Sequence, residues 1–216
     1  MSLPHPEAEG FVLAGGRSSR MGRDKALIEV ASKPLVEHAI QILRGAGLES
    51  RIAGATSDLS TFAPLVPDLP DESGLGPLAG ICAALEACTS LAVFLPVDLP
   101  LIPPSLIQYL VHHATVTNST VTVVSVAGFV QTFPAVASRA ALASLRTSLH
   151  SGDRNCLKAF RAVPGGLSVL PLELLVQAGQ VKHPRALYPS QWFLNLNTPE
   201  DVQRLNATTA QHPPFR

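Results

Sequence analysis

Short apolar segments alternate with amphipathic helical patterns along the first half of the chain. Residues 10–14 (GFVLA) and 91–97 (LAVFLPV) are almost wholly apolar, and residues 51–55 form a third candidate strand. Apolar runs of this length are typical of strands that are buried on both faces. Helical patterns separate these strands, over residues 34–43 and 78–87. This order predicts a three-layer α/β/α fold around a mainly parallel sheet.

The second half of the chain departs from this regular alternation. Candidate strands at 120–126 and 130–137 follow one another without a helix between them, which indicates an antiparallel part of the sheet. The region 64–76 is rich in Pro, Asp and Gly and is expected to be a loop. The remaining expected elements are helices at 105–112, 140–149, 157–162 and 199–205, and short strands at 167–170 and 193–196.

A chain of 216 residues is long enough for one domain with its own core. We expect a single domain over residues 10–206. A disordered segment, 1–9, would precede it, and a flexible polar tail, 207–216, would follow it.

Composition argues against several classes of protein. Sixteen basic residues balance sixteen acidic ones, which leaves no basic surplus for binding nucleic acid or an anionic membrane. The three cysteines lack a C-x-x-C pair and the seven histidines lack an H-E-x-x-H pattern, so neither a disulfide framework nor a zinc site is indicated. No apolar run approaches the ~20 residues that span a bilayer. The N-terminus is unlike a signal peptide, and we expect a cytoplasmic protein.

The segment after the first expected strand combines glycines with basic residues. It reads LAGGRSSRMGRDK from Leu13 to Lys25, and it leaves the strand end at which parallel α/β sheets bind ligands. Its glycines let backbone amides approach phosphate oxygens, and Arg17, Arg20, Arg23 and Lys25 supply positive charge. Neither the P-loop pattern nor G-x-G-x-x-G is present. These residues alone are equally consistent with a phosphate-binding loop and with a solvated basic turn.

A longer stretch, LAGGRSSRMGRDKALIEVASKPLVEH, resembles the signature of the MobA-like nucleotidyltransferases. Three further segments fit the same family in the same order: GPLAG at 76–80, LPVDLP at 95–100 and NLNTPED at 195–201. The resemblance covers about residues 11–205, and the first motif is the most specific. It implies a Rossmann-like sheet of the nucleotide-diphospho-sugar transferase type. It also implies a reaction that joins GMP from GTP to molybdopterin phosphate and releases pyrophosphate.

The implied reaction requires positioning and charge neutralisation on the triphosphate. A general base is not needed, because the attacking phosphate is already ionised. By resemblance, Lys25 would contact the triphosphate, and Arg20, with Arg17 as a second candidate, would offset charge on a phosphate. Asp98 would hold Mg²⁺, which prefers one or two carboxylates plus phosphate oxygens and water. Without the motif, the cations would be ordinary surface residues and Asp98 a turn or cap residue.

The same resemblance identifies contacts for the nucleotide. Asp68 would contact the ribose or the base, with Asp71 as the competing candidate, and the GPLAG backbone would press against the purine edge. The expected nucleotide-binding residues are Leu13, Ala14, Gly15, Gly16, Lys25, Asp68, Gly76, Pro77, Leu78 and Asp98.

Weaker matches concern the acceptor. Arg154 lies in a segment similar to the family's pterin-side loop, and Asn195 and Asn197 lie in a region that borders the second substrate. Asn197 is also a candidate metal ligand. The alternatives are a surface turn for Arg154 and an Asx turn, capped by Thr198, for the two asparagines.

Three positions depart from the family pattern. Gly54 lies in a stretch where an Asn often touches the nucleotide, Asn155 stands where a second Arg is common, and Phe133 stands where a His often precedes Pro. Two other functions therefore remain open. One is a transferase that uses CTP or another NTP with a different phosphate acceptor, and the other is a nucleotide-binding regulatory domain without turnover. We expect a monomer that contacts cofactor-handling proteins only transiently.

Overall fold

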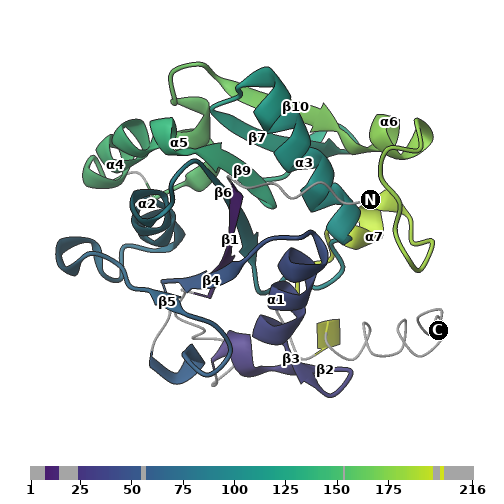
Figure 1. Cartoon of the computed structure of the whole chain (residues 1–216), viewed down its shortest axis with the longest axis horizontal. Helices are drawn as coiled ribbons and strands as arrows, with labels where there is room; N and C mark the ends of the chain where they lie inside the picture. Colours follow the sequence, from purple (N-terminus) through teal and green to yellow (C-terminus); the bar gives the residue numbers. More distant parts are fainter. Residues whose placement is uncertain (1–7, 15–23, 55–56, 153, 197–199, 202–216) are drawn as a thin grey trace.

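The structure, a computed structural model, describes residues 8–14, 24–54, 57–152, 154–196 and 200–201. An eight-stranded sheet runs through the centre of the molecule (Figure 1). Its order is β10 (Leu167–Pro171), β7 (Val121–Val126), β9 (Ala135–Ser138), β6 (Leu91–Pro96), β1 (Ala8–Leu13), β4 (Ser50–Ala53) and β5 (Leu65–Val66), with β8 (Phe129–Val130) paired to β7.

The half of the sheet built from the first part of the chain is parallel. Strand β1 lies between β6 and β4, with Phe11 paired to Phe94 on one side and to Arg51 on the other. Strand β5 extends this parallel set beyond β4. Strand β9 is antiparallel to both β6 and β7, whereas β10 is parallel to β7. The expected mainly parallel sheet with an antiparallel departure is confirmed.

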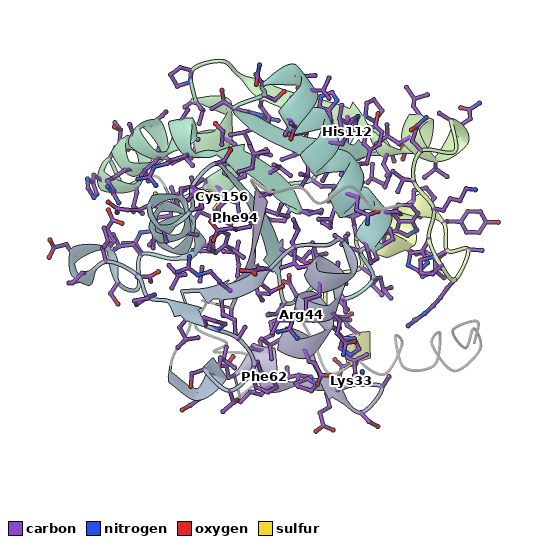
Figure 2. The ribbon with its side chains drawn as sticks, in the orientation of Figure 1. Lys33, Arg44, Phe62, Phe94, His112 and Cys156 are labelled. Carbon is purple, nitrogen blue, oxygen red and sulfur yellow. The ribbon has the colours of Figure 1, made fainter. Side chains whose placement is uncertain are left out.

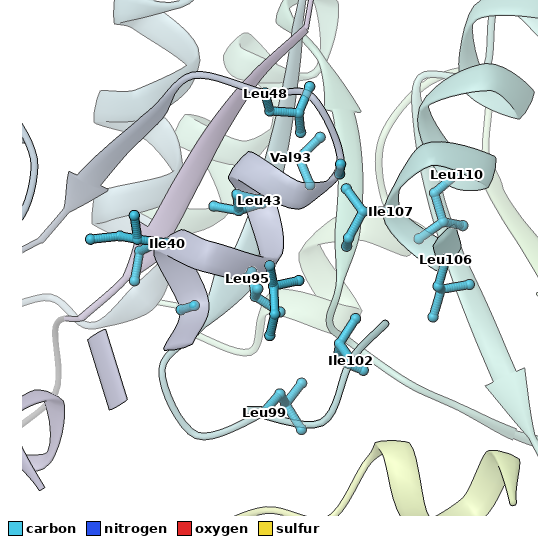
Figure 3. Packing of buried hydrophobic residues seen from close by; sticks show 14 of the residues in the cluster. Ile40, Leu43, Leu48, Val93, Leu95, Leu99, Ile102, Leu106, Ile107 and Leu110 are labelled. Atoms are coloured by element: carbon cyan, nitrogen blue, oxygen red, sulfur yellow. The ribbon is translucent and has the colours of Figure 1, made fainter. Parts of the chain in front are cut away.

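Helices cover both faces of the sheet because alternate strand residues are apolar on both faces. Val12 of β1 and Val93 and Leu95 of β6 pack with two helices, α1 (Leu35–Gly45) and α3 (Pro104–Thr117), in one buried cluster (Figure 3). Helix α1 comes after the segment that leaves β1, and helix α3 comes after the segment that leaves β6.

The other face of the sheet carries a second buried cluster. Phe11 and Phe94 pack there with α2 (Pro77–Ala87), α4 (Leu142–His150) and α5 (Cys156–Arg161), and both Phe94 and the first residue of α5 lie in this interior (Figure 2). The expected three-layer α/β/α architecture is therefore confirmed.

Helices α2 and α3 both begin at proline. Pro77 and Pro104 occupy the first position of α2 and α3, where a missing N–H costs no helical hydrogen bond. Gly76 precedes α2 with φ of 94°, a conformation that favours glycine. The GPLAG segment thus turns the chain sharply into α2.

The structure differs from the sequence-based prediction in the first part of the chain. Strand β1 begins at Ala8, so residues 8 and 9, expected in a disordered segment, belong to the sheet because Ala8 pairs with Leu91. A hairpin of β2 (Glu29–Val30) and β3 (Lys33–Pro34) was not predicted from the sequence.

Further differences lie in the second part. The strand predicted over 130–137 is divided into β8 and β9, since Pro134 between them has no N–H for a strand ladder. The strand predicted at 193–196 is wrong, because this segment has no strand partner. Helices α6 (Leu172–Gln177) and α7 (Pro189–Trp192) were not predicted.

Two other expectations concern the C-terminal region and the membrane. Of the helix predicted at 199–205, the structure describes only residues 200–201, which are helical, and the expected tail at 207–216 lies outside the described residues. Within the ranges given above, no helix combines the length and the apolar character required to cross a bilayer.

Candidate functional site

The three central parallel strands end at one edge of the sheet. Leu13, the last residue of β1, pairs with Ala53 of β4 and with Pro96 of β6. Hydrogen bonds continue this alignment past the strands: the Ala14 N–H donates to the Ala53 carbonyl at 3.4 Å, and the Val97 N–H donates to the Leu13 carbonyl at 3.3 Å. The segments that follow β1, β4 and β6 therefore start side by side, at the position where parallel α/β sheets bind ligands.

Two of the predicted charged residues meet at this edge. Lys25 Nζ donates to Asp98 Oδ2 at 2.9 Å, and the two side chains are 21% and 25% exposed. Lys25 begins the short helix η1 (Lys25–Leu27), which Asp24 caps by accepting a hydrogen bond from the Ala26 N–H at 3.0 Å. Because Ala26 is fully buried, η1 is fixed to the core and holds Lys25 beside the end of β6.

The loop that carries Asp98 is held from several directions. Leu99, Leu101 and Ile102 are buried and anchor it in the apolar layer of α1 and α3. The Leu196 N–H donates to the Asp98 carbonyl at 3.2 Å, so the C-terminal segment also fixes this loop. These contacts present the Asp98 carboxylate, partly exposed, at the edge of the sheet.

His183 supports the same loop through a hydrogen bond to its backbone. Its Nδ1 accepts a hydrogen bond from the Arg185 N–H at 3.1 Å, and its Nε2 therefore carries the proton that binds the Leu101 carbonyl at 3.1 Å. The ring lies 5.5 Å from that of Trp192, which is buried. Burial lowers the pKa of His183, which favours the neutral imidazole that this arrangement requires.

Asp68 lies close to the first turn of α2 and to the residue that follows β4. A Cβ placed on Gly80 would lie 3.6 Å from Asp68 Oδ1 and 3.4 Å from the Gly54 nitrogen, so these groups are in close proximity around α2. Asp68 Oδ1 is buried and has no hydrogen-bond partner among the residues that the structure describes. Burial raises the pKa of the Asp68 carboxyl, although a backbone bond to Gly74 opposes this shift. An acceptor without a partner at this place is available to a ligand.

The competing candidate Asp71 has a different environment. It is exposed on η3 (Pro70–Glu72), whereas Asp68 is only partly exposed and lies against α2. The geometry favours Asp68 over Asp71 as the residue that faces the edge of the sheet. Gly76 and Pro77 lie at the entrance to α2, and Leu78 is buried beneath it.

The predicted acceptor residues lie on separate segments. Arg154 is exposed just before α5, whose N-cap Asn155 accepts a hydrogen bond from the Lys158 N–H at 3.0 Å. Asn195 is exposed next to the buried Leu196. Phe133, where the family often has His, packs edge-on against Phe160 of α5 with ring centroids 6.2 Å apart.

Several predicted residues lie outside the described residues, so the structure does not place them. They are Gly15, Gly16, Arg17, Arg20, Arg23, Asn197 and Thr198.

The donor set around Asp98 suits an ion that arrives with phosphate ligands. Among the residues that the structure describes, no group of three or more His, Cys, Asp or Glu side chains is placed to hold a metal. One partly exposed carboxylate at the ligand-binding edge is nevertheless the contribution that Mg²⁺ needs when phosphate oxygens and water complete its shell. The residues present therefore fit a magnesium ion bound together with a nucleotide.

The three cysteines do not contribute a nucleophile. All are buried, and burial raises the pKa of Cys82 to about 12 and that of Cys156 to about 11. Reactive cysteines instead have lowered pKa values and access to solvent. Lys25, Asp98 and Asp68 are the predicted site residues that the structure does describe at this edge.

Comparison with known proteins identifies the family. The profile of a family described as MobA-like NTP transferase domain matches residues 10–164 of this chain. The chain belongs to this family. As a MobA-like NTP transferase it is a nucleotidyltransferase, so the predictions of family and enzyme class are confirmed. The matched region includes Lys25, Asp68, Asp98 and Arg154.

Two relatives of this MobA-like NTP transferase illustrate the range of similarity. It is 29% identical over 217 residues to a molybdenum cofactor guanylyltransferase of Rhodobacter capsulatus, across 95% of this chain and 98% of the relative. It is 42% identical over 108 residues to a molybdenum cofactor guanylyltransferase of Xanthomonas euvesicatoria pv. vesicatoria (strain 85-10). That second match spans 50% of this chain and 54% of the relative.

A solved structure supports the fold. Molybdopterin-guanine dinucleotide biosynthesis protein A from Archaeoglobus fulgidus superposes with a TM-score of 0.76, over 94% of this chain and 99% of that chain, at 20% sequence identity. The likeness confirms the predicted Rossmann-like nucleotidyltransferase architecture of the MobA-like chain.

Sequence reasoning missed two residues that shape this site. Glu72 is buried within a segment that was expected to be an ordinary loop, and His183 supports the Asp98 loop from a distant part of the chain. Neither residue belongs to a recognisable motif. Glu72 contacts α4 and His183 contacts the loop after β6, and no local sequence pattern predicts these contacts.

Proposed function

We propose that this chain is a molybdenum cofactor guanylyltransferase. It transfers GMP from GTP to the phosphate of a molybdopterin-type acceptor and releases pyrophosphate. The observation that carries the proposal is the contact of 2.9 Å between Lys25 and Asp98 at the carboxyl edge of the parallel sheet. The names of its full-length and partial relatives support the choice of GTP and of the molybdenum cofactor.

The triphosphate is bound by the segment between β1 and η1. An oxygen of the acceptor phosphate forms a bond to the α-phosphorus of GTP. The bond from the α-phosphorus to the oxygen that bridges it to the β-phosphorus breaks, and pyrophosphate leaves with that oxygen. Lys25 binds a phosphate oxygen as a point charge, and Arg20 offsets charge on a phosphate of the leaving or the incoming group. Gly15 and Gly16 provide backbone amides close to the phosphates.

Asp98 is the residue that holds the metal. Mg²⁺, when bound, neutralises charge on the triphosphate and orients the phosphate oxygens. Asp98 would be the protein ligand of the metal, and Lys25, which donates to Asp98 at 2.9 Å, would contact a phosphate oxygen beside it. Buried side chains and the Leu196 N–H anchor the Asp98 loop, which would hold the carboxylate in place for the metal.

The nucleoside lies against the start of α2. The Asp68 carboxylate accepts hydrogen bonds from the ribose or from the purine edge, which gives its buried oxygen a partner. Leu13, Ala14, Gly76, Pro77 and Leu78 line this part of the site. Arg154, Asn195 and Asn197 are the residues proposed, from the family resemblance, to contact the acceptor.

A second nucleotide preference is suggested by one specific feature. Gly54 follows β4, at a place where the family resemblance implies an Asn that touches the nucleotide, and its nitrogen lies close to α2. A transferase without that Asn has one fewer contact with which to select guanine, and CTP is the alternative substrate.

Protection against thermal unfolding by the four NTPs tests the nucleotide. With Mg²⁺, we expect GTP to raise the Tm most, since a ligand at 100 times its Kd stabilises the folded state by about 2.7 kcal/mol. A larger shift with CTP or ATP would reject GTP as the substrate. Protection by GTP without any pyrophosphate release in the presence of acceptor would instead indicate a regulatory nucleotide-binding domain.

A further inference from the structure

The loop between β5 and α2 is anchored by a charged residue. All ten residues of this loop, 67–76, are described, and Glu72 is the one that is buried, with 2% of its surface exposed. Asp68 lies four residues before Glu72, and Gly76 lies four residues after it. A carboxylate is rarely buried unless it is paired, so this residue needs a structural explanation.

The partners of Glu72 come from one face of α4. Glu72 Oε1 accepts a hydrogen bond from His150 Nε2 at 3.0 Å and forms an ion pair with Arg146 Nε at 3.2 Å. Arg146 and His150 are four residues apart and therefore lie on the same face of the helix. Arg146 Nη2 also donates to Glu86 Oε2 of α2 at 2.6 Å. The cluster thus connects the loop to both helices of this layer.

The base of this anchor is rigid. Leu145 and Leu149 of α4 are buried in the apolar cluster that also contains most of α2. Within the loop itself, the Glu72 N–H donates to the Leu69 carbonyl at 2.9 Å, and the Leu75 N–H donates to the Glu72 carbonyl at 3.1 Å. The contact of Glu72 with α4 therefore fixes the backbone on both sides of it.

The two ends of the loop are held by backbone contacts. A Gly74 backbone group bonds to the Asp68 carboxyl, whose Oδ1 is buried without a partner among the described residues. The Ala79 N–H donates to the Gly76 carbonyl at 3.1 Å, and Gly76 has a φ of 94°, which glycine adopts readily. Between these ends the residues other than Glu72 are exposed or only partly buried, so Glu72 is the buried side chain that connects the loop to α4.

We infer that Glu72 is a positioning residue, which holds the loop from Asp68 to Gly76 in the conformation that binds the nucleoside part of GTP. Glu72 acts through this loop and touches neither the triphosphate nor the metal. The inference rests on the proposed function, in which Asp68 and the start of α2 receive the nucleoside.

Two probes separate the halves of the nucleotide site. In the proposed function, GTP binds both to the segment between β1 and η1 and to the loop 67–76. Inorganic tripolyphosphate binds only to the segment between β1 and η1. Calorimetric Kd values for both probes, measured with Mg²⁺, should respond differently in Glu72→Ala. We expect its Kd for GTP to rise about tenfold, with Kd for tripolyphosphate unchanged. Glu72→Gln, which keeps the size and one acceptor, should show a smaller rise.

Glu86→Ala is the matched control, because it removes the other carboxylate bound to Arg146 without touching the loop. It should leave both Kd values unchanged. His150→Ala removes a loop contact from an exposed position on α4, and it serves as the second test if Glu72→Ala does not fold. If Glu72→Ala folds, an unchanged ratio of its two Kd values would overturn the inference. If Glu72→Ala does not fold, an unchanged ratio in both Glu72→Gln and His150→Ala would overturn it. Wild-type protein that binds tripolyphosphate but no NTP would reject the proposed function itself.

Discussion

The ammonium group of Lys25 lies 2.9 Å from a carboxylate oxygen of Asp98, although 73 residues separate them in the chain. Both side chains are partly exposed, so a ligand can reach each of them. A cation suited to phosphate and a carboxylate suited to a divalent metal are thus held together at the end of β1 and β6. In the proposed function, this pairing would let one small edge of the sheet contact a triphosphate and hold its metal.

Replacement of Asp98 should remove activity and spare the fold. For Asp98→Ala we expect Mg²⁺-dependent pyrophosphate release to fall by about two orders of magnitude or more, since the metal loses its protein ligand. The lost ion pair with Lys25 is partly exposed and is worth at most about 1 kcal/mol, so the Tm should change little. Substantial metal-dependent turnover in the folded variant would show that another residue holds the metal.

Lys25 should contribute to nucleotide binding more than to stability. In Lys25→Ala the triphosphate loses a charge-assisted hydrogen bond, worth about 1.5–3 kcal/mol, so the Kd for GTP should rise at least tenfold. Lys33→Ala is the matched control, because Lys33 forms a surface ion pair with Glu37 on the β3–α1 segment. Calorimetric binding and thermal unfolding of both variants check this. A collapse of the Tm in Lys25→Ala with unchanged GTP affinity would make Lys25 a structural residue.

The two aspartates of the β5–α2 loop should behave differently. Asp68→Ala removes the carboxylate that lies against α2, and we expect the Kd for GTP to rise about tenfold through loss of hydrogen bonds to the nucleoside. Asp71→Ala, on the exposed η3, should have no effect on binding. The measurement is GTP binding by calorimetry for both variants. The reverse order of effects would transfer the nucleoside contact to Asp71.

Mild acid should destabilise the protein through His183. Burial and the nearby Arg185 lower the pKa of His183 below its usual 6.5, so the unfolded chain binds this proton more readily than the folded one. The contribution to stability is therefore complete above pH 6.5 and decreases as the pH falls below it. Comparison of the Tm at pH 7.5 and 5.5 should show a smaller decrease for His183→Gln than for wild type.

His112→Gln is the control for this pH effect. His112 is exposed on α3, so its replacement should leave the pH dependence of the Tm as in wild type (Figure 2). An identical decrease in His183→Gln and in wild type would remove His183 from the account of acid sensitivity.

The central strands could be predicted from sequence because they are buried on both faces. Apolar side chains at consecutive positions, such as Phe11 and Val12, contact helices on opposite sides of the sheet, and this leaves an uninterrupted apolar run. The β2–β3 hairpin was missed because its turn consists of Ala31 and Ser32, with φ of 48° and 63°, where Gly or Asn is the usual signal. Helix α6 has only six residues, too few to show a clear helical period.

Tertiary contacts overrode the local pattern elsewhere. The apolar residues at 193–196 suggested a strand, yet the Leu196 N–H binds the Asp98 carbonyl and its side chain is buried in the core. Lys25 and Asp98 were predicted to act together from motif resemblance, whereas Glu72 was not predicted at all. Its burial depends on Arg146 and His150, which lie far along the chain and carry no pattern of their own.

Pyrophosphate release with molybdopterin as acceptor measures guanylyl transfer by this chain itself. The purified chain is incubated with Mg²⁺, acceptor and each NTP in turn, with Asp98→Ala as the inactive reference. With GTP we expect pyrophosphate in proportion to guanylylated product, dependent on both metal and acceptor. Release that is absent with GTP, or faster with CTP, would contradict the proposed function.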